Sequence, residues 1–503
     1  MVQGSGSRRA EVIGAGLAGC EAALQCARFG VPVRLFEMRP GRMTEAHETG
    51  DVAELVCSNS LKSDEPENAH GLLKAELRVL GSVLLECAER ARVPGGKALV
   101  VDRRRFSVEV QSELARAGVS IERAEVSSLP PAAAWYRARS VLSDPHQPTV
   151  DLGKLTVIPG ESDESRNLSG ETAGLSGPCR TVRIATLPGG HSEGGIVVVA
   201  TGPLTSSPMA DALQALLGTD RLFFYDAIAP IVSAESLDMT CIFEGSRYGA
   251  GSDYLNCPMN EEEYDQFVTA LLGAELHPLH EFEKPQFFEG CLPVEEIARR
   301  GRLALAFGPM KPVGLADPLT GKRPFAVVQL RRENAEGTMY NMVGFQTRLT
   351  QGEQERVFRM IPGLEKVTFS RSGSIHRNTF LDSPKVLLPT LQTRASSDLI
   401  VAGQLSGVEG YVESIGAGLV AGINAAQLAG GEEPVELPRE TMLGSLLHYI
   451  TSPSDNFQPM NANFGLLPPL EKRLRGRDKR RVLAERALGV AREFALTLAD
   501  NGG

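Results

Sequence analysis

The chain has 503 residues, a mass of 54.0 kDa and a formal net charge of −10. Its 42% hydrophobic and 23% charged residues are typical of a globular protein with a sizeable core, and the length predicts roughly two to four domains. The negative charge argues against a generally basic nucleic-acid protein, although a local basic face is enough to bind phosphates. No apolar run approaches the length of a transmembrane helix, and the N-terminus lacks the apolar region of a signal peptide.

Eight cysteines are scattered over the chain, at positions 20, 26, 57, 87, 179, 241, 257 and 291. They form no CxxC pair and no cysteine–histidine cluster with zinc-ligand spacing, so we expect no metal site. The pattern is typical of reduced thiols, which predicts a cytoplasmic protein.

A nucleotide-binding unit is predicted at residues 11–37, EVIGAGLAGCEAALQCARFGVPVRLFE. A short strand leads to the G-x-G-x-x-G loop formed by Gly14, Gly16 and Gly19. A helix then spans about 17–29, and a second strand ends at Glu37. The glycines allow a tight turn, approach of a pyrophosphate to the backbone, and close helix–strand packing. Glu37 can accept hydrogen bonds from a ribose. Loop residues Ala15, Leu17 and Ala18 belong to the same predicted site.

Two later segments favour FAD over a nicotinamide nucleotide as the resident cofactor. GGIVVVATGPL (194–204) ends a strand at Thr201 and Gly202, and residues 398–426 read as a strand, a glycine-rich turn and a helix. Strands that return to one sheet from distant parts of the chain suit an interrupted FAD-type domain. The second turn, with Gly403, Gln404 and Gly410, places helix N-terminal amides near the flavin nucleotide.

Several long strings together resemble the TrmFO family, the folate- and FAD-dependent tRNA (uracil-5-)-methyltransferases. They are VIGAGLAGCEAA, ELVCSNSLKSD, FGPMKPVGL, TGKRPFAVVQLR, YNMVGFQTRLT, HRNTFLDSPKVL and GQLSGVEGYVES. The likeness covers about residues 10–480, and part of it extends to the related GidA-type flavoproteins. Residues 135–195, with Trp135 and Cys179, depart from the family and are interpreted as an insertion, partly disordered, with a strand pair as the alternative.

The resemblance implies transfer of a one-carbon unit from 5,10-methylenetetrahydrofolate to C5 of the T-loop uridine at tRNA position 54, with FAD as carrier and NADH or NADPH as reductant. Uracil C5 becomes nucleophilic when a thiolate adds to C6, and a low-pKa cysteine can supply that thiolate. By resemblance, Cys57 and Cys257 are the catalytic pair. Cys257 is expected to attack C6, just ahead of a helix capped by Asn260. Cys57 is expected to work near the flavin or at the C5 proton.

Three basic segments are candidates for tRNA or folate contacts. Arg103, Arg104 and Arg105 form the first, for which a solvated face or a contact to FAD phosphates is the simpler interpretation. The second supplies Lys311, Lys322, Arg323, Arg331 and Arg332. The third, a predicted C-terminal helix and the favoured phosphate-binding candidate, supplies Lys472, Arg473, Arg475, Arg477, Lys479, Arg480 and Arg481. His376, beside Arg377, is either an acid–base group or a structural histidine.

The predicted fold is α/β, with a Rossmann-like FAD-binding domain formed by 8–205 and 335–435. An inserted α+β domain spans 206–334, and a basic helical tail spans 436–503. Two other functions stay open at this point. One is a GidA-like flavoprotein that modifies the wobble uridine with a partner GTPase, and the other is a non-catalytic, flavin-containing tRNA-binding protein. The sequence indicates no membrane partner and leaves the oligomeric state undetermined.

Overall fold

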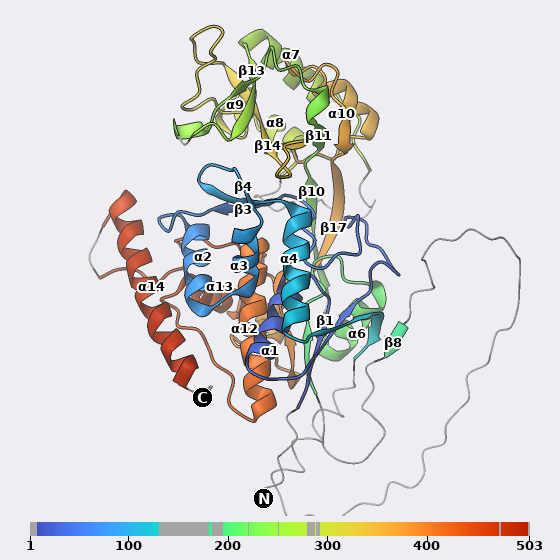
Figure 1. Cartoon of the computed structure of the whole chain (residues 1–503), viewed down its shortest axis with the longest axis vertical. Helices are drawn as coiled ribbons and strands as arrows, with labels where there is room; N and C mark the ends of the chain where they lie inside the picture. The colour runs from blue at the N-terminus through green and yellow to red at the C-terminus, as the bar shows by residue number, and fades with distance from the viewer. Residues whose placement is uncertain are drawn as a thin grey trace, which may run out of the picture.

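The computed structural model describes residues 8–129, 181–183, 195–219, 221–249, 251–278, 287, 292–471 and 474–500. Two domains lie one above the other, and a two-stranded ribbon runs between them (Figure 1). The larger domain carries both ends of the described chain. The smaller domain is built from the middle of the chain.

The first domain is organised around a six-stranded sheet of order β18-β19-β9-β1-β2-β6, in which β19 to β6 are parallel and β18 is antiparallel to β19. This sheet uses β1 (Ala10–Ile13), β2 (Val33–Glu37), β6 (Ser120–Arg123), β9 (Ile196–Val199), β18 (Gln392–Thr393) and β19 (Ser396–Val401). Smaller sheets use β3 (Ser60–Ser63), β4 (Arg92–Val93), β5 (Ala98–Val101), β7 (Glu125–Ser128) and β8 (Thr181–Arg183). The central strands β1 and β9 are fully buried, as expected for strands covered on both faces.

Helices cover both faces of this sheet. The helical elements of the first domain are α1 (Leu17–Arg28), α2 (Ala69–Leu80), α3 (Val83–Arg90), α4 (Arg103–Arg116), α6 (Ser207–Leu217), α11 (Ser383–Val386), η4 (Gly403–Ser406), α12 (Tyr411–Gly430), α13 (Met442–Thr451) and α14 (Gly476–Asp500). Buried residues of α1, α12 and α13 share one core cluster. Met209 and Leu213 of α6 pack on the opposite face, with Ile13 and Val199 of the sheet.

The most extensive helix contact in the first domain joins α1 to α12, which are separated by more than 380 residues of the chain. A Cβ placed on Gly418 would lie 2.3 Å from Ala18 O, and one on Gly422 would lie 2.5 Å from Ala22 O. Only glycine therefore allows the two backbones to approach this closely. The thiol of Cys26 on α1 also contacts α12, since it donates a hydrogen bond to Gly422 O at 3.3 Å.

The second domain has its own sheet and core. The sheet order is β12-β13-β14-β15-β11-β16, and its pairings are antiparallel. Its elements are β11 (Ile231–Ser233), η1 (Ala234–Ser236), β12 (Phe243–Glu244), η2 (Arg247–Gly249), β13 (Tyr254–Met259), α7 (Glu261–Leu272), α8 (Val294–Arg299), α9 (Ala304–Phe307), β14 (Ala326–Arg332), β15 (Met339–Met342), α10 (Gln351–Phe358) and β16 (Phe369–Arg371). The core packs the sheet against α7 and α10, with Tyr264, Phe267, Phe345 and Phe358 fully buried.

An antiparallel ribbon of β10 (Arg221–Ile228) and β17 (Ser374–Leu381) carries the chain into and out of the second domain. The second sheet therefore draws strands from residues 231 to 371. The predicted boundaries, 206–334, are displaced at both ends. Helix α6 packs in the first domain, and β15, α10 and β16 return to the second domain after residue 334.

The α/β fold class, the discontinuous first domain, the inserted domain and the helical C-terminal segment are confirmed. Helix α13 is buried in the core of the first domain, whereas α14 lies along its outside against α2 (Figure 1). Among the described helices, none is long and apolar enough to cross a membrane.

Candidate active site

The loop between β1 and α1 has the close packing that the three glycines predict. Gly14 has a φ of +99°, and a Cβ there would lie 2.6 Å from Ala200 O. A Cβ on Gly19 would lie 1.8 Å from Gly14 O. A Cβ on Gly16, the N-cap of α1, would meet no protein atom within 4 Å. The loop is thus packed against protein at its two ends and open at Gly16, where a phosphate needs to approach the backbone.

A cavity lies in front of this loop, with about 1020 Å³ of empty volume that includes space open to solvent. The residues predicted from the sequence meet in its wall: Gly14, Gly16, Leu17, Ala18, Glu37, Thr201, Gly202, Gly403 and Gln404. Segments almost 390 residues apart in sequence therefore line one cavity. Of the other predicted residues, Gly19 packs behind the loop, Ala15 bonds to Glu37, and Gly410 is the N-cap of α12 with a φ of +118°.

Glu37 is held by a partner that the sequence analysis did not consider. Both Glu37 oxygens accept hydrogen bonds from Arg39, whose Nε lies 2.9 Å from Oε1, and Oε2 also accepts from Ala15 N at 3.0 Å. Burial favours the neutral acid, but the hydrogen bonds and charge of Arg39 outweigh it and hold the pKa of Glu37 below its usual value. The carboxylate is therefore fixed and largely occupied before any ribose is added.

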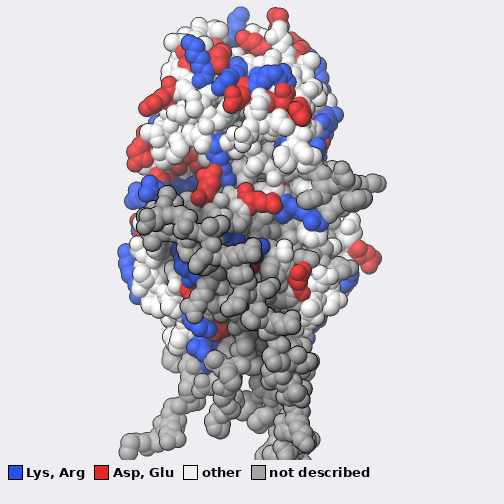
Figure 2. All heavy atoms as spheres, turned by 90° about the vertical axis from the view of Figure 1, so that its right-hand side faces the viewer, with Lys and Arg blue, Asp and Glu red and all other residues white. Residues whose placement is uncertain are grey.

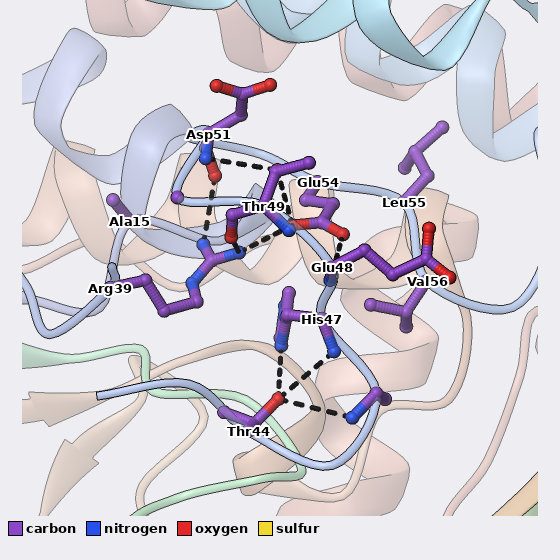
Figure 3. Close-up of polar contacts among 12 residues, drawn as sticks. Ala15, Arg39, Thr44, His47, Glu48, Thr49, Asp51, Glu54, Leu55 and Val56 are labelled. Atoms are coloured by element: carbon purple, nitrogen blue, oxygen red, sulfur yellow. Dashed lines mark hydrogen bonds and ion pairs between the residues drawn. The ribbon is translucent and has the colours of Figure 1, made fainter. Parts of the chain in front are cut away.

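Arg39 in turn orders the segment 44–54 beside the cavity (Figure 3). Its guanidinium donates to Glu54 at 2.9 Å, to Asp51 O at 3.0 Å and to Thr49 O at 3.3 Å. Glu54 then accepts from the backbone amides of Glu48 and Thr49. His47 and Thr44, joined at 2.6 Å, line the same cavity. One buried arginine thus connects the end of β2 to the loop that leads to Cys57.

Cys57 lies at the N-terminal end of α12, against Tyr411 of the cavity wall. Its Sγ is 3.0 Å from Tyr411 Oη, and the same oxygen accepts the backbone N–H groups of Cys57 and Ser58 at 2.9 and 3.1 Å. Burial and the negative Asp226 raise the pKa of the Cys57 thiol to about 12, although the hydrogen bond to Tyr411 and the charge of Arg103 oppose this. Tyr411 was missed by the sequence analysis, although it follows Gly410 in the GVEGYVES string.

Two arginines that were candidates for phosphate or folate contacts lie beside Cys57, where Arg331 is buried and Arg103 is half-buried. Arg103 donates to Leu55 O and Val56 O and forms an ion pair with Glu333 at 2.7 Å. Arg331 donates to Ser58 Oγ and Asn59 Oδ1, each at 2.9 Å, and is 7% exposed. In this structure the guanidinium of Arg331 is occupied by the loop that follows Cys57, so its contact with tRNA or folate stays a prediction.

Cys257 lies in a different environment from Cys57. It is in β13, opposite Val328 of β14, and its side chain is fully buried in the core of the second domain. Asn260 does cap α7, as predicted, by accepting from Glu263 N at 2.9 Å. Burial nevertheless raises the pKa of Cys257, which opposes the expected effect of the helix N-terminus on its thiol. A catalytic role for Cys257 now rests on the family resemblance alone.

The remaining basic candidates lie on the surface. Arg323 is exposed, and Lys311 Nζ lies 5.6 Å from the ring centroid of the exposed Tyr248. Arg475, Arg477 and Arg480 are exposed on or beside α14, where Arg477 pairs with Glu67 at 2.6 Å. On the face shown in Figure 2, basic and acidic side chains are interspersed over the second domain. Lys472 and Arg473 lie outside the described residues.

His376 is 4% exposed in β17, with its Nε2 3.9 Å from Asp226 Oδ2, and burial lowers its pKa. The neighbouring Arg377 stacks on Phe223, 3.4 Å from the ring centroid. The structure thus places His376 in the ribbon between the domains, without deciding between its two predicted roles. Cys291 and nearly all of the 135–195 insertion, with Trp135 and Cys179, lie outside the described residues. Within the described ranges, no group of three or more His, Cys, Asp or Glu side chains could hold a metal ion.

Comparison with known proteins agrees with this geometry. The model of the family "Glucose inhibited division protein A" matches residues 9–433. The chain is 51% identical over 483 residues to the methylenetetrahydrofolate--tRNA-(uracil-5-)-methyltransferase TrmFO of Moorella thermoacetica, covering 95% of this chain and 96% of the relative. It is 49% identical over 493 residues to the TrmFO of Heliobacterium modesticaldum, covering 97% and 98%.

The chain belongs to the TrmFO family. Among solved structures, Aquifex aeolicus GidA in the form II crystal superposes with a TM-score of 0.62 at 17% identity, covering 98% of this chain and 76% of GidA. At that identity the superposition supports the shared fold and carries no argument about the modified base. Members of the TrmFO family therefore provide the functional comparison for this chain.

Proposed function

We propose that this protein methylates C5 of the T-loop uridine of tRNA, with 5,10-methylenetetrahydrofolate as carbon donor, FAD as resident cofactor and NADH or NADPH as reductant. The proposal extends to cytoplasmic action, where tRNA is available. Two observations together carry it. The sequence is 51% and 49% identical to TrmFO relatives over almost the whole chain, and a thiol, Cys57, is held beside a cavity of the kind that binds dinucleotides.

The residues present fit a flavin dinucleotide. Gly16 leaves open space at the N-terminus of α1, Glu37 is fixed at the end of β2, and Tyr411 begins a second helix at the far wall of the cavity. The N-termini of α1 and α12 both suit negative charge, because unpaired amides and the helix dipole meet there. Bound at this site, the flavin would supply the redox chemistry and carry the one-carbon unit.

Cys57 and its neighbours can control a proton at the reacting base. Tyr411 Oη accepts two backbone N–H groups, so its own proton is available to the Cys57 sulfur. A hydrogen bond donated to the sulfur favours the thiolate, whereas burial and Asp226 oppose it. We propose that Cys57 works at the flavin edge as nucleophile or as acceptor of the C5 proton, and that it needs a change in charge or solvation when substrates bind.

The decisive experiment uses the purified full-length protein with unmodified tRNA, methylenetetrahydrofolate labelled in the methylene carbon, and NADPH. Nuclease digestion followed by mass spectrometry should show labelled 5-methyluridine from the T loop. Product at the wobble uridine, or a requirement for a partner GTPase, would support the GidA-like alternative. Binding of tRNA without labelled product would support the non-catalytic alternative. The same assay with NADH in place of NADPH measures which reductant the protein prefers.

A further inference from the structure

The peptide group between Val56 and Cys57 is held from both of its ends. Its carbonyl, Val56 O, accepts from Arg371 Nη1 at 2.8 Å and from Arg103 Nη1 at 3.2 Å. Its amide, Cys57 N, donates to Tyr411 Oη at 2.9 Å. Because the peptide group is planar, fixing both ends fixes the plane from which the Cys57 side chain projects. Together with the 3.0 Å contact between Cys57 Sγ and the same Tyr411 oxygen, these bonds restrain the position of the thiol.

Arg371 is the member of this set that comes from the second domain. It ends β16, separated by two residues from the start of the ribbon strand β17, and its side chain is 12% exposed. Its other guanidinium arm donates to Ala46 O at 2.9 Å, and its Nε pairs with Glu48 at 2.8 Å. One planar guanidinium thus bridges the loop 44–48 and the residue before Cys57, which a lysine ammonium with its single nitrogen cannot reproduce.

We infer that Arg371 is a positioning residue that makes the orientation of the Cys57 thiol depend on how the second domain is docked. Arg331 of β14 supports the same segment from its other side, through Ser58 and Asn59. A displacement of the second domain would withdraw Arg371 from Val56 O and release the thiol from Tyr411. The inference rests on the proposed role of Cys57, but its test does not depend on methylation.

The test measures alkylation of Cys57 by iodoacetamide in full-length, FAD-loaded protein, with the modified peptides quantified by mass spectrometry. R371K and R371Q should raise the rate at Cys57 roughly three- to tenfold at each pH between 7 and 10, because the thiol gains solvent and its pKa falls from its raised value. The Cys257 peptide serves as an internal reference, since this buried thiol reacts only if the fold opens. The matched control is R356K, an exposed arginine of the second domain that pairs with Glu353.

Methylation kinetics give the second measurement. The variants should lower kcat roughly 10- to 100-fold, as expected for a misplaced reacting group, while the KM for tRNA and the bound FAD stay within about twofold. If R371Q does not fold, as faster Cys257 alkylation would reveal, R371K carries the test. Unchanged Cys57 alkylation in a folded R371K protein would overturn the inference. Faster alkylation in a protein that never methylates tRNA would retain the inference and remove the proposed function.

Discussion

The segments around Cys57 and Cys257 show how differently one fold can hold the same side chain. Cys57 lies in an irregular stretch whose backbone and polar side chains are bonded to Tyr411, Arg103, Arg331 and Arg371, from both domains. Cys257 lies in a regular strand of the second domain, with no exposed area and apolar neighbours. A thiol that must react needs polar control and access, whereas a thiol that fills a core needs neither.

Removal of each thiol gives the largest expected difference. C57A should lower methylation roughly 10²- to 10⁴-fold with FAD still bound, because a proton-transfer or nucleophilic group is lost. C257A should keep activity within about threefold and lower the free energy of unfolding by about 1–2 kcal/mol, as for a small core deletion. Activity assays and urea unfolding of both variants check this, with C291A assayed beside them. Loss of turnover in a stable C257A protein would restore the role expected from the family resemblance.

The buried ion pair between Glu37 and Arg39 should make the stability of the first domain depend on pH. E37Q should lower the free energy of unfolding at pH 7 by about 1.5–3 kcal/mol, since it removes one of the two carboxylates that pair with the buried Arg39 and leaves Glu54 as the other. The depressed pKa of Glu37 means that this stabilisation is present above the unfolded carboxyl pKa of about 4.3 and is lost as pH falls through the lower folded value.

Urea unfolding of E37Q and the parent protein at pH 7, 5 and 3.5 measures that difference. The difference between the two stabilities should shrink as the pH falls below about 4.3. The neighbouring E48Q is the control, because Glu48 is exposed and contacts Arg371 rather than Arg39. A difference that is the same at all three values would contradict the assigned ionisation.

Substitution of Gly16 tests whether the open part of the loop between β1 and α1 binds the cofactor. G16A should leave the thermal midpoint within about 2 °C, because its Cβ meets no protein atom within 4 Å. It should weaken FAD binding roughly tenfold, about 1.4 kcal/mol, by occupying the approach of the pyrophosphate. Flavin titration of the apoprotein measures this, with G489A on α14 as the control glycine. Equal FAD affinity in G16A and the parent protein would show that the FAD phosphates do not bind at this loop.

The smallest expected effects are on the outer helix. Arg475→Gln and Arg480→Gln should each reduce the slope of log affinity for tRNA against log salt by about 0.7–0.9, if each arginine contacts one phosphate. Arg477→Gln should change the slope less, because Arg477 is paired with Glu67. Filter binding at several salt concentrations measures the slopes. Equal salt-dependence slopes for the parent protein and the three variants would show that these arginines of α14 and its start do not contact RNA phosphates.

The sequence predicted the first domain well because its signals are local. The glycine loop and the buried strands β1, β9 and β19 each depend on residues close together in the chain, as does the Asn260 cap in the second domain. The second domain was delimited poorly, because β15 and β16 join its sheet only through pairing with β14 and β11. The contacts of Arg331 within the protein could not be predicted for a similar reason. A basic residue in a strand gives no sign that its partner is Asn59, 272 residues away.

The glycine-mediated contact between α1 and α12 has a consequence for synthesis on the ribosome. Helix α1 is complete at residue 28, yet the helix that covers it begins only at Tyr411. At about 5–20 residues per second, roughly 20–80 s pass after α1 is synthesised before α12 emerges and can cover it. The second domain, whose sheet closes by residue 371, can finish earlier. The unfinished first domain is therefore where a chaperone holding exposed apolar helices would act during translation.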